Sequence, residues 1–164
     1  MLGALIGLIN LILMIFLTEK NKDRLVRIGK EMTYISEMTL TGGLIMISIG
    51  TYLVGVWANE SWGRYWGWDA KETWALVTIL VYAFILHMRL IRGLRGVYAF
   101  NLASLFGWAS VIMTYYGVNY YLSGLHSYAA GDPVPIPGWV YIAVASCIVI
   151  SLLAYWRKKK YNVF

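Results

Sequence analysis

The side chains with the clearest chemical potential lie between residues 57 and 74. Five of the eight tryptophans of the chain fall there, at positions 57, 62, 66, 68 and 74. Five charged side chains are interspersed among them, which excludes the stretch from hydrocarbon. They are Glu60, Arg64, Asp69, Lys71 and Glu72. An ordinary aromatic belt at a membrane interface accounts for one or two tryptophans per helix end. The density here favours a surface for a flat, apolar ligand with polar edges.

The two histidines of the chain are candidate ligands to a metal ion, such as an iron. His126 lies in a polar stretch and His87 lies near the end of an apolar run. If Trp74 marks one interface, thirteen helical residues place His87 about 20 Å deeper. Two imidazoles on one iron lie only about 4 Å apart, so the two histidines are predicted to serve separate sites. A solvated role for His126 and an interfacial role for His87 beside Arg89 are the alternatives.

Asp69 and Glu72 have the spacing of a helix capping box. In this motif the first side chain accepts a bond from a free backbone N–H, and the second reaches back to the cap residue. The pattern predicts that a helix begins directly after Asp69. A helix that begins at this position would fix the orientation of the preceding tryptophans.

Composition predicts an integral membrane protein of all-α class. The 164 residues are 60% hydrophobic with a mean hydropathy of +0.62, outside the range of soluble domains. Residues 1–164 are therefore expected to form one membrane domain. The net charge of +6 comes from short basic clusters between apolar runs, which is the pattern of membrane topology and argues against nucleic acid as a partner.

The single cysteine, Cys147, cannot form an internal disulfide. No Cys-x-x-Cys-His occurs in the sequence, so the chain does not carry its own covalently attached haem. The first residues lack the basic region of a cleavable signal peptide.

The hydropathy pattern predicts about five transmembrane helices. The first apolar run is short for a span, and its Gly3 and Gly7 have the small-xxx-small spacing that permits close helix contact. The link at 19–37 has apolar residues at helical spacing and is predicted to lie partly as an amphipathic helix on the membrane. The expected spans are 2–17, 38–57, 73–90, 97–117 and 139–156.

Basic residues mark one side of this topology. If five spans alternate, one side receives five basic residues after the first span, three after the third and four at the C-terminus, twelve of the fourteen in the chain. The positive-inside rule then places the N-terminus, the tryptophan-rich segment and the His126 loop outside and the C-terminus in the cytoplasm.

Several motifs resemble a known family in the same order. Trp62-Gly-Arg-Tyr-Trp66-Gly-Trp68-Asp69 is similar to the tryptophan-rich WWD signature of membrane proteins that handle haem in cytochrome c biogenesis. The resemblance covers roughly residues 38–130 and is greatest to the CcsA/ResC type of system II. The further matching segments are Ala70-Lys-Glu-Thr-Trp-Ala-Leu, Leu86-His-Met-Arg89, Gly117-Val-Asn119 and Gly124-Leu-His-Ser-Tyr-Ala129.

The resemblance implies a function and a set of site residues. Haem would rest on the signature residues Trp62, Trp66, Trp68 and Asp69, with His126 as an external iron ligand and His87 as a membrane-embedded one. It would then be attached to the Cys-x-x-Cys-His thiols of an apocytochrome c, so the chain would form part of a haem lyase or synthase.

The resemblance also implies what else is needed. The chain is similar to the C-terminal part of such a protein, so the other axial ligands would come from a preceding membrane portion and from a CcsB/ResB-like partner. The expected location is a bacterial cytoplasmic membrane or a thylakoid-type membrane.

Two other functions fit parts of the sequence. A b-type electron-transfer subunit would need paired histidines at two depths, and two histidines in total cannot provide them. A small transporter or structural subunit with an aromatic belt would tolerate replacement of its tryptophans and would not copurify with haem.

Overall fold

The fold is entirely helical in the residues that the structure, a computed structural model, describes, namely 1–122 and 135–163. The predicted all-α class is confirmed, whereas the assignment of 1–164 to one domain stays a prediction. The α-helices are α1 (Leu2–Ile15), α2 (Lys22–Trp62), α3 (Ala70–His87), α4 (Val97–Ile112), α5 (Val118–Tyr121) and α6 (Gly138–Tyr161). A 3-10 helix, η1 (Met88–Leu90), follows α3, and a π-helix, η2 (Met113–Gly117), joins α4 to α5.

Four helices in the described ranges are long and apolar enough to cross a membrane, rather than about five. They are α2, the run from α3 through η1, the run from α4 through α5, and α6. Helix α1 has 14 residues, about 21 Å at 1.5 Å per residue, which is short of a hydrocarbon core of about 30 Å. The run from α4 through α5 also continues to Tyr121, four residues beyond the predicted end of the 97–117 span.

Helix α2 corrects the prediction for residues 19–37. We expected a separate amphipathic helix lying on the membrane, but residues 22–62 form one continuous helix of 41 residues. No proline interrupts this stretch, so the polar and apolar parts propagate the same hydrogen-bond ladder. Residues 38–59 carry no charged side chain and span about 33 Å, close to the thickness of the hydrocarbon core.

The serine and threonine hydroxyls of this uncharged stretch are hydrogen-bonded within α2 itself. Each of four hydroxyls donates a hydrogen bond to the carbonyl oxygen one turn earlier, at 2.6–2.8 Å. These hydroxyls belong to Thr39, Thr41, Ser48 and Thr51. Because each of these four hydroxyl protons has an acceptor, the serine and threonine side chains of this stretch can face lipid without an unpaired donor.

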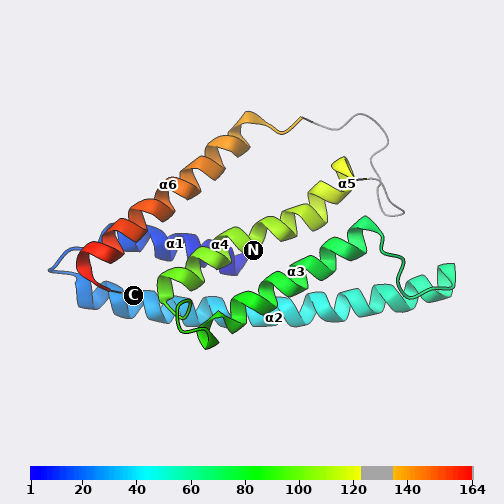
Figure 1. The fold of residues 1–164 in the computed structure, drawn as a ribbon, viewed down its shortest axis with the longest axis horizontal. Helices are drawn as coiled ribbons and strands as arrows, with labels where there is room; N and C mark the ends of the chain where they lie inside the picture. The colour runs from blue at the N-terminus through cyan, green and yellow to red at the C-terminus, as the bar shows by residue number, and fades with distance from the viewer. Residues whose placement is uncertain (123–134, 164) are drawn as a thin grey trace.

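Helix α2 runs the length of the bundle (Figure 1). Helix α1 packs beside the first part of α2, and α3 packs beside its later part. The α1–α2 turn, the α3–α4 connection and the C-terminus lie toward one end of the bundle, and the α2–α3 connection lies at the other. The three basic clusters thus gather toward one end, as the charge pattern predicts. Their orientation relative to the membrane stays a prediction.

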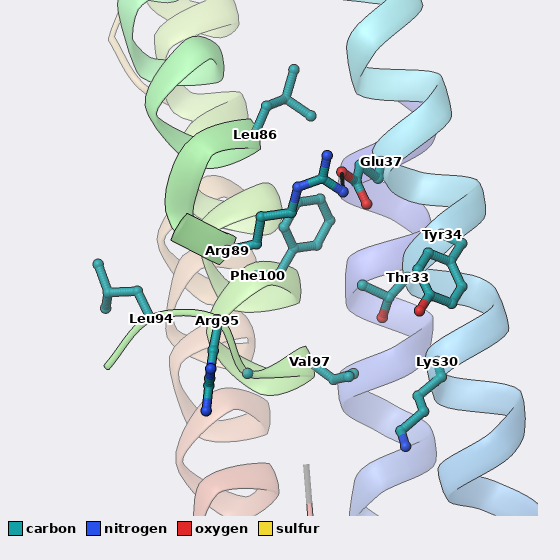
Figure 2. Close-up of a pocket in the computed structure, with 11 residues that line it drawn as sticks. Lys30, Thr33, Tyr34, Glu37, Leu86, Arg89, Leu94, Arg95, Val97 and Phe100 are labelled. Atoms are coloured by element: carbon teal, nitrogen blue, oxygen red, sulfur yellow. Dashed lines mark ion pairs between the residues drawn. The ribbon is translucent and has the colours of Figure 1, made fainter. Parts of the chain in front are cut away.

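One ion pair marks the boundary of the uncharged stretch of α2. Arg89, in η1, lies 2.6 Å from the carboxylate of Glu37 (Figure 2). Glu37 is the last charged residue of α2 before residues 38–59. The pair therefore links η1 to α2 at the point where the charged part of α2 ends and its uncharged part begins.

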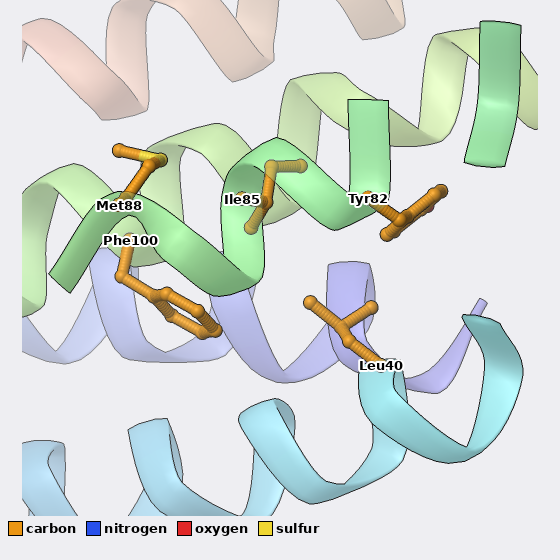
Figure 3. Packing of buried hydrophobic residues seen from close by; sticks show 5 residues of the cluster. All are labelled: Leu40, Tyr82, Ile85, Met88 and Phe100. Atoms are coloured by element: carbon orange, nitrogen blue, oxygen red, sulfur yellow. The ribbon is translucent and has the colours of Figure 1, made fainter. Parts of the chain in front are cut away.

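Two apolar clusters hold the bundle together. The first joins α2, α3, η1 and α4 (Figure 3) and consists of Leu40, Tyr82, Ile85, Met88 and Phe100. The second joins α1, the connection after it, and α6. It consists of Leu11, Met14, Leu17 and Ala154. Outside these clusters many large apolar side chains are exposed, as expected for helices whose outer faces contact lipid.

A buried polar junction links three helices. The Asn10 amide donates to the Gly29 carbonyl oxygen at 2.8 Å and to the Thr33 hydroxyl at 3.1 Å. Asn101 of α4 donates to the same hydroxyl at 2.8 Å. Both asparagine side chains are fully buried. The junction therefore fixes the register of α1, α2 and α4 by bonds that the apolar clusters alone do not specify.

The small-xxx-small prediction for Gly3 and Gly7 is confirmed, and the two glycines face different helices. A Cβ on Gly3 would lie 2.5 Å from the end of the Leu40 side chain on α2. A Cβ on Gly7 would lie 2.8 Å from the backbone carbonyl oxygen of Asn101 on α4. Gly7 thus permits backbone contact between α1 and α4, whereas Gly3 accommodates a movable side chain.

Candidate functional site: the tryptophan-rich segment

The tryptophan-rich segment is partly helical. We expected a connection over residues 57–74, but α2 continues to Trp62 and α3 begins at Ala70. Gly63 ends α2 with a φ of 71°, and its N–H donates to the Asn59 carbonyl oxygen at 2.8 Å. A glycine suits this left-handed position because it has no Cβ. Only residues 63–69 are non-helical, so rigid helices hold both ends of the segment.

Two edge-to-face tryptophan pairs flank Gly63. The ring centroids of Trp57 and Trp62 lie 5.1 Å apart at an interplanar angle of 76°, and those of Trp66 and Trp68 lie 5.8 Å apart at 86°. Edge contact stabilises each pair without covering both ring faces. Trp68 is 72% exposed. The segment therefore leaves wide apolar ring surfaces exposed.

The predicted capping box at Asp69 and Glu72 is confirmed. The Asp69 carboxylate accepts from the backbone of the first turn of α3, including the Lys71 N–H at 3.3 Å. The Glu72 carboxylate accepts from the Asp69 N–H at 3.3 Å and also from the Gly67 N–H at 2.8 Å. This second bond extends the cap into the loop and was not predicted.

The extended cap surrounds a strained residue. Trp68, between the two amides bound by Glu72, has a φ of 56°, a left-handed conformation that costs a non-glycine residue about 1–2 kcal/mol. Glu72 offsets this cost by binding the backbone on both sides of Trp68. We infer that Glu72 sets the direction in which the exposed Trp68 ring projects.

Replacement of Glu72 by alanine should loosen the loop. Two backbone donors would lose their acceptor, so we expect a loss of about 1–3 kcal/mol of local stability. Hydrogen exchange read by mass spectrometry should then show faster exchange in the peptide containing residues 63–69. Glu60→Ala, an exposed charge change in the same segment, is the matched control. Equal exchange in the two variants would show that the cap does not hold the loop.

Residues of η2 and α5 form hydrogen bonds to the start of α3, at the end of the tryptophan-rich segment. The Lys71 ammonium donates to the Asn119 side-chain oxygen at 3.5 Å. The Thr114 hydroxyl lies 2.9 Å from the Trp74 carbonyl oxygen and 2.9 Å from the Thr78 hydroxyl. Thr114 belongs to the π-helix η2, and such single-turn insertions are frequent at functional sites. Thr114 is not among the predicted site residues, and Asn119 occurs only as part of the family-like segment Gly117-Val-Asn119.

A tyrosine cluster follows the π-helix toward the same end of the bundle. The Tyr116 ring centroid lies 4.5 Å from that of Tyr120 and 6.4 Å from that of Tyr121. The sequence analysis did not single out these residues. The two Tyr-Tyr pairs at 115–116 and 120–121 were the available signal, and the helical turns between them bring the rings together.

One donor of the segment has no acceptor. The Trp66 indole N–H is buried and has no hydrogen-bond partner, although such groups usually find one. Nearby, the Arg64 guanidinium packs over Gly67, where an added Cβ would lie 3.1 Å from the guanidinium carbon. The segment thus combines apolar ring faces with a cation and an indole donor.

His87 lies at the opposite end of α3. Its Nδ1 donates to the Ala83 carbonyl oxygen at 2.6 Å, because a carbonyl oxygen can only accept. The neutral tautomer then leaves Nε2 as a lone-pair donor for a metal. The ring is exposed and lies thirteen residues from Trp74 on the same continuous helix, about 20 Å away as predicted.

Comparison with known proteins identifies the family. The family model described as cytochrome C assembly protein matches residues 1–126. This chain belongs to the cytochrome c assembly protein family. It is 51% identical over 160 residues to protein NrfI of Wolinella succinogenes, an alignment that covers 98% of this chain and 18% of that protein.

CcsA-type relatives of the family match over a shorter range. The cytochrome c biogenesis protein CcsA of Cyanophora paradoxa is 44% identical over 104 residues, covering 63% of this chain and 32% of the relative. The CcsA protein of Parasynechococcus marenigrum is 46% identical over 100 residues, covering 61% and 32%. The chain thus spans between about a fifth and a third of the length of these relatives.

The structure places the predicted site residues of this family member in two regions. Trp62, Trp66, Trp68 and Asp69 lie together in the tryptophan-rich segment, and His87 lies at the far end of α3. His126 lies outside the described residues. The roles assigned to these residues toward haem stay predictions.

Proposed function

We propose that this chain binds haem on the tryptophan-rich segment and presents it for attachment to apocytochrome c, as part of a larger complex. The observation that carries the proposal is the capped segment with exposed tryptophan rings, in a chain whose residues 1–126 match the cytochrome c assembly family. Haem is the cargo here rather than a resident cofactor.

The residues present fit this cargo. The porphyrin is flat and apolar and would be held against the tryptophan rings by stacking and burial. Its two carboxylates need donors at the edge of that surface. The exposed Arg64 guanidinium is the candidate, because a guanidinium binds carboxylates in a bidentate manner, whereas the Trp66 N–H is buried.

Histidine ligation would hold the iron at two separate sites. His126 would bind the haem on the tryptophan-rich segment, and His87 would bind haem deeper in the membrane through Nε2. The second axial ligand of each iron would come from the rest of the complex, namely a preceding membrane portion and a CcsB/ResB-like partner.

Attachment would depend on position more than on acid–base groups of this chain. A thiol of the Cys-x-x-Cys-His motif adds across a haem vinyl group: a carbon–sulfur bond forms, the proton passes to the other vinyl carbon, and no group leaves. Holding the vinyl groups against the incoming thiols is the contribution expected of the segment. The segment and the His126 loop would lie on the outer face of a bacterial cytoplasmic or thylakoid-type membrane.

Replacement of Trp62, Trp66 and Trp68 by leucine tests the proposal. The chain would be coexpressed with its upstream portion and its partner, and haem per protein would be measured by absorbance after purification. We expect the triple variant to retain less than about a fifth of the haem, since each lost aromatic contact weakens binding by about 0.5–1.5 kcal/mol.

The matched control replaces Trp139 and Trp156 by leucine. Both are exposed tryptophans at the two ends of α6, so they test the effect of losing tryptophans as such. Equal haem content in the triple variant and in the control would refute haem binding by the segment and favour an aromatic belt.

A further inference from the structure

A second pocket lies at the other end of α3, away from the tryptophan-rich segment. It has a volume of about 310 Å³ and lies between α2 and the connection from α3 to α4 (Figure 2). We call it the basic pocket, because its lining includes Lys30, Arg89 and Arg95 and a single carboxylate, that of Glu37. No role in the proposed function uses it.

The charges of the basic pocket are not balanced. The Glu37 carboxylate is bound by Arg89 at 2.6 Å. Among the described residues this is the only salt bridge, so Lys30 and Arg95 face no carboxylate within 4 Å there. Three cations against one carboxylate leave an excess of two positive charges. Figure 2 shows the Lys30 and Arg95 side chains extending in the same direction from opposite walls. The pocket is thus suited to an anion.

The remaining walls are apolar. Phe100 is buried behind the Arg89–Glu37 pair, and Leu86, Leu94 and Val97 complete the lining from α3, the connection and α4. An anionic group in the pocket would therefore lie against these apolar side chains, which favours an amphiphile over a free ion.

The position of the basic pocket along the membrane normal agrees with the level expected for lipid headgroups. Glu37 is the last charged residue before the uncharged residues 38–59 of α2, which match the hydrocarbon thickness. A group bound beside Glu37, Lys30 and Arg95 would lie just outside that layer, where lipid phosphates lie. Basic pockets between transmembrane helices are a known means of binding anionic headgroups.

We propose that the basic pocket binds the phosphate-bearing headgroup of an anionic glycerophospholipid. Arg95 supplies the planar fork that suits phosphate oxygens, and Lys30 supplies a second, compact charge. The bound lipid would bridge α2 and the α3–α4 connection, next to the ion pair that already joins them. The proposal is independent of haem binding.

Lipid binding by the purified full chain in detergent tests the proposal. Native mass spectrometry would compare phosphatidylglycerol with phosphatidylcholine of identical acyl chains. We expect the wild-type chain to prefer phosphatidylglycerol by about tenfold or more. The variant Lys30→Gln/Arg95→Gln should bind phosphatidylglycerol about tenfold more weakly or worse, because each basic residue near an anionic group contributes roughly a fivefold preference.

The control variant is Arg24→Gln/Arg92→Gln. It removes the same number of charges from the same two parts of the chain, but neither residue lines the pocket. Its lipid preference should stay within about twofold of wild type, because neither charge lies beside the bound headgroup. Equal losses in both variants, or no preference for phosphatidylglycerol in the wild type, would overturn the proposal. Displacement of the lipid by millimolar inorganic phosphate would overturn it in favour of a free-phosphate site.

Discussion

Replacement of His126 by alanine is expected to remove most of the haem held on the tryptophan-rich segment. An iron that loses an axial imidazole loses both a bond and the constraint that orients the ring. Removal of even a residue that only orients a metal ligand costs about 10–100-fold in affinity, so the loss should be at least as large here. Haem per protein, measured on the complex with the upstream portion and partner, reports the effect.

The two histidines should act separately. Since His87 lies about 20 Å along α3 from Trp74, His87→Ala should deplete a different haem population, and only the double variant should lose both. Ser127→Ala, in the same stretch of sequence as His126, is the control and should leave haem content unchanged. If His126→Ala keeps its haem and still supports cytochrome c maturation, the assignment of His126 is wrong.

Replacement of Gly7 by alanine should destabilise the bundle. The added Cβ would lie 2.8 Å from the Asn101 carbonyl oxygen, so the backbones of α1 and α4 must move apart. Overpacking of this kind costs about 1–3 kcal/mol, and the movement would also strain the bonds that Asn10 and Asn101 make to Thr33. Thermal unfolding of the purified chain in detergent should show a clearly lower midpoint.

Gly3→Ala is the matched control on the same helix. There the Cβ meets side-chain atoms rather than backbone, namely Leu40 at 2.5–2.8 Å and the Ser36 hydroxyl at 3.4 Å, which can shift, and alanine favours the helix by about 0.5–1 kcal/mol. Gly3→Ala should therefore unfold close to the wild-type midpoint. A Gly7→Ala midpoint equal to that of Gly3→Ala would mean that contact between the backbones of α1 and α4 does not limit stability.

Local patterns in the sequence predicted the parts that depend on neighbours along the chain. The hydropathy runs located the apolar segments, and the spacing of Asp69 and Glu72 predicted the start of α3 within one residue. These predictions succeed because helix periodicity and capping involve residues only a few positions apart. The motifs from Trp62 to Arg89 likewise indicated the family that the comparisons identify.

The errors occurred where local signals compete. The polar residues 22–37 and the apolar residues after them belong to different environments, so the sequence suggested two elements. Because no helix-breaking residue separates them, they form one helix. At its other end, α2 continues through Trp57 and Trp62 for the same reason. It ends at Gly63, where a glycine permits a left-handed turn.

By itself, the sequence determined the helical membrane class, the gathering of basic residues toward one end and the aromatic segment near the other. Only the tertiary structure decided that Glu72 binds the backbone on both sides of Trp68, that Gly7 meets the Asn101 carbonyl, and that Lys30 and Arg95 flank one pocket. The physical reason is distance along the chain. Helix formation and capping are local, whereas the position of Lys30 and Arg95 on the walls of one pocket depends on how the helices pack, which no spacing in the sequence encodes.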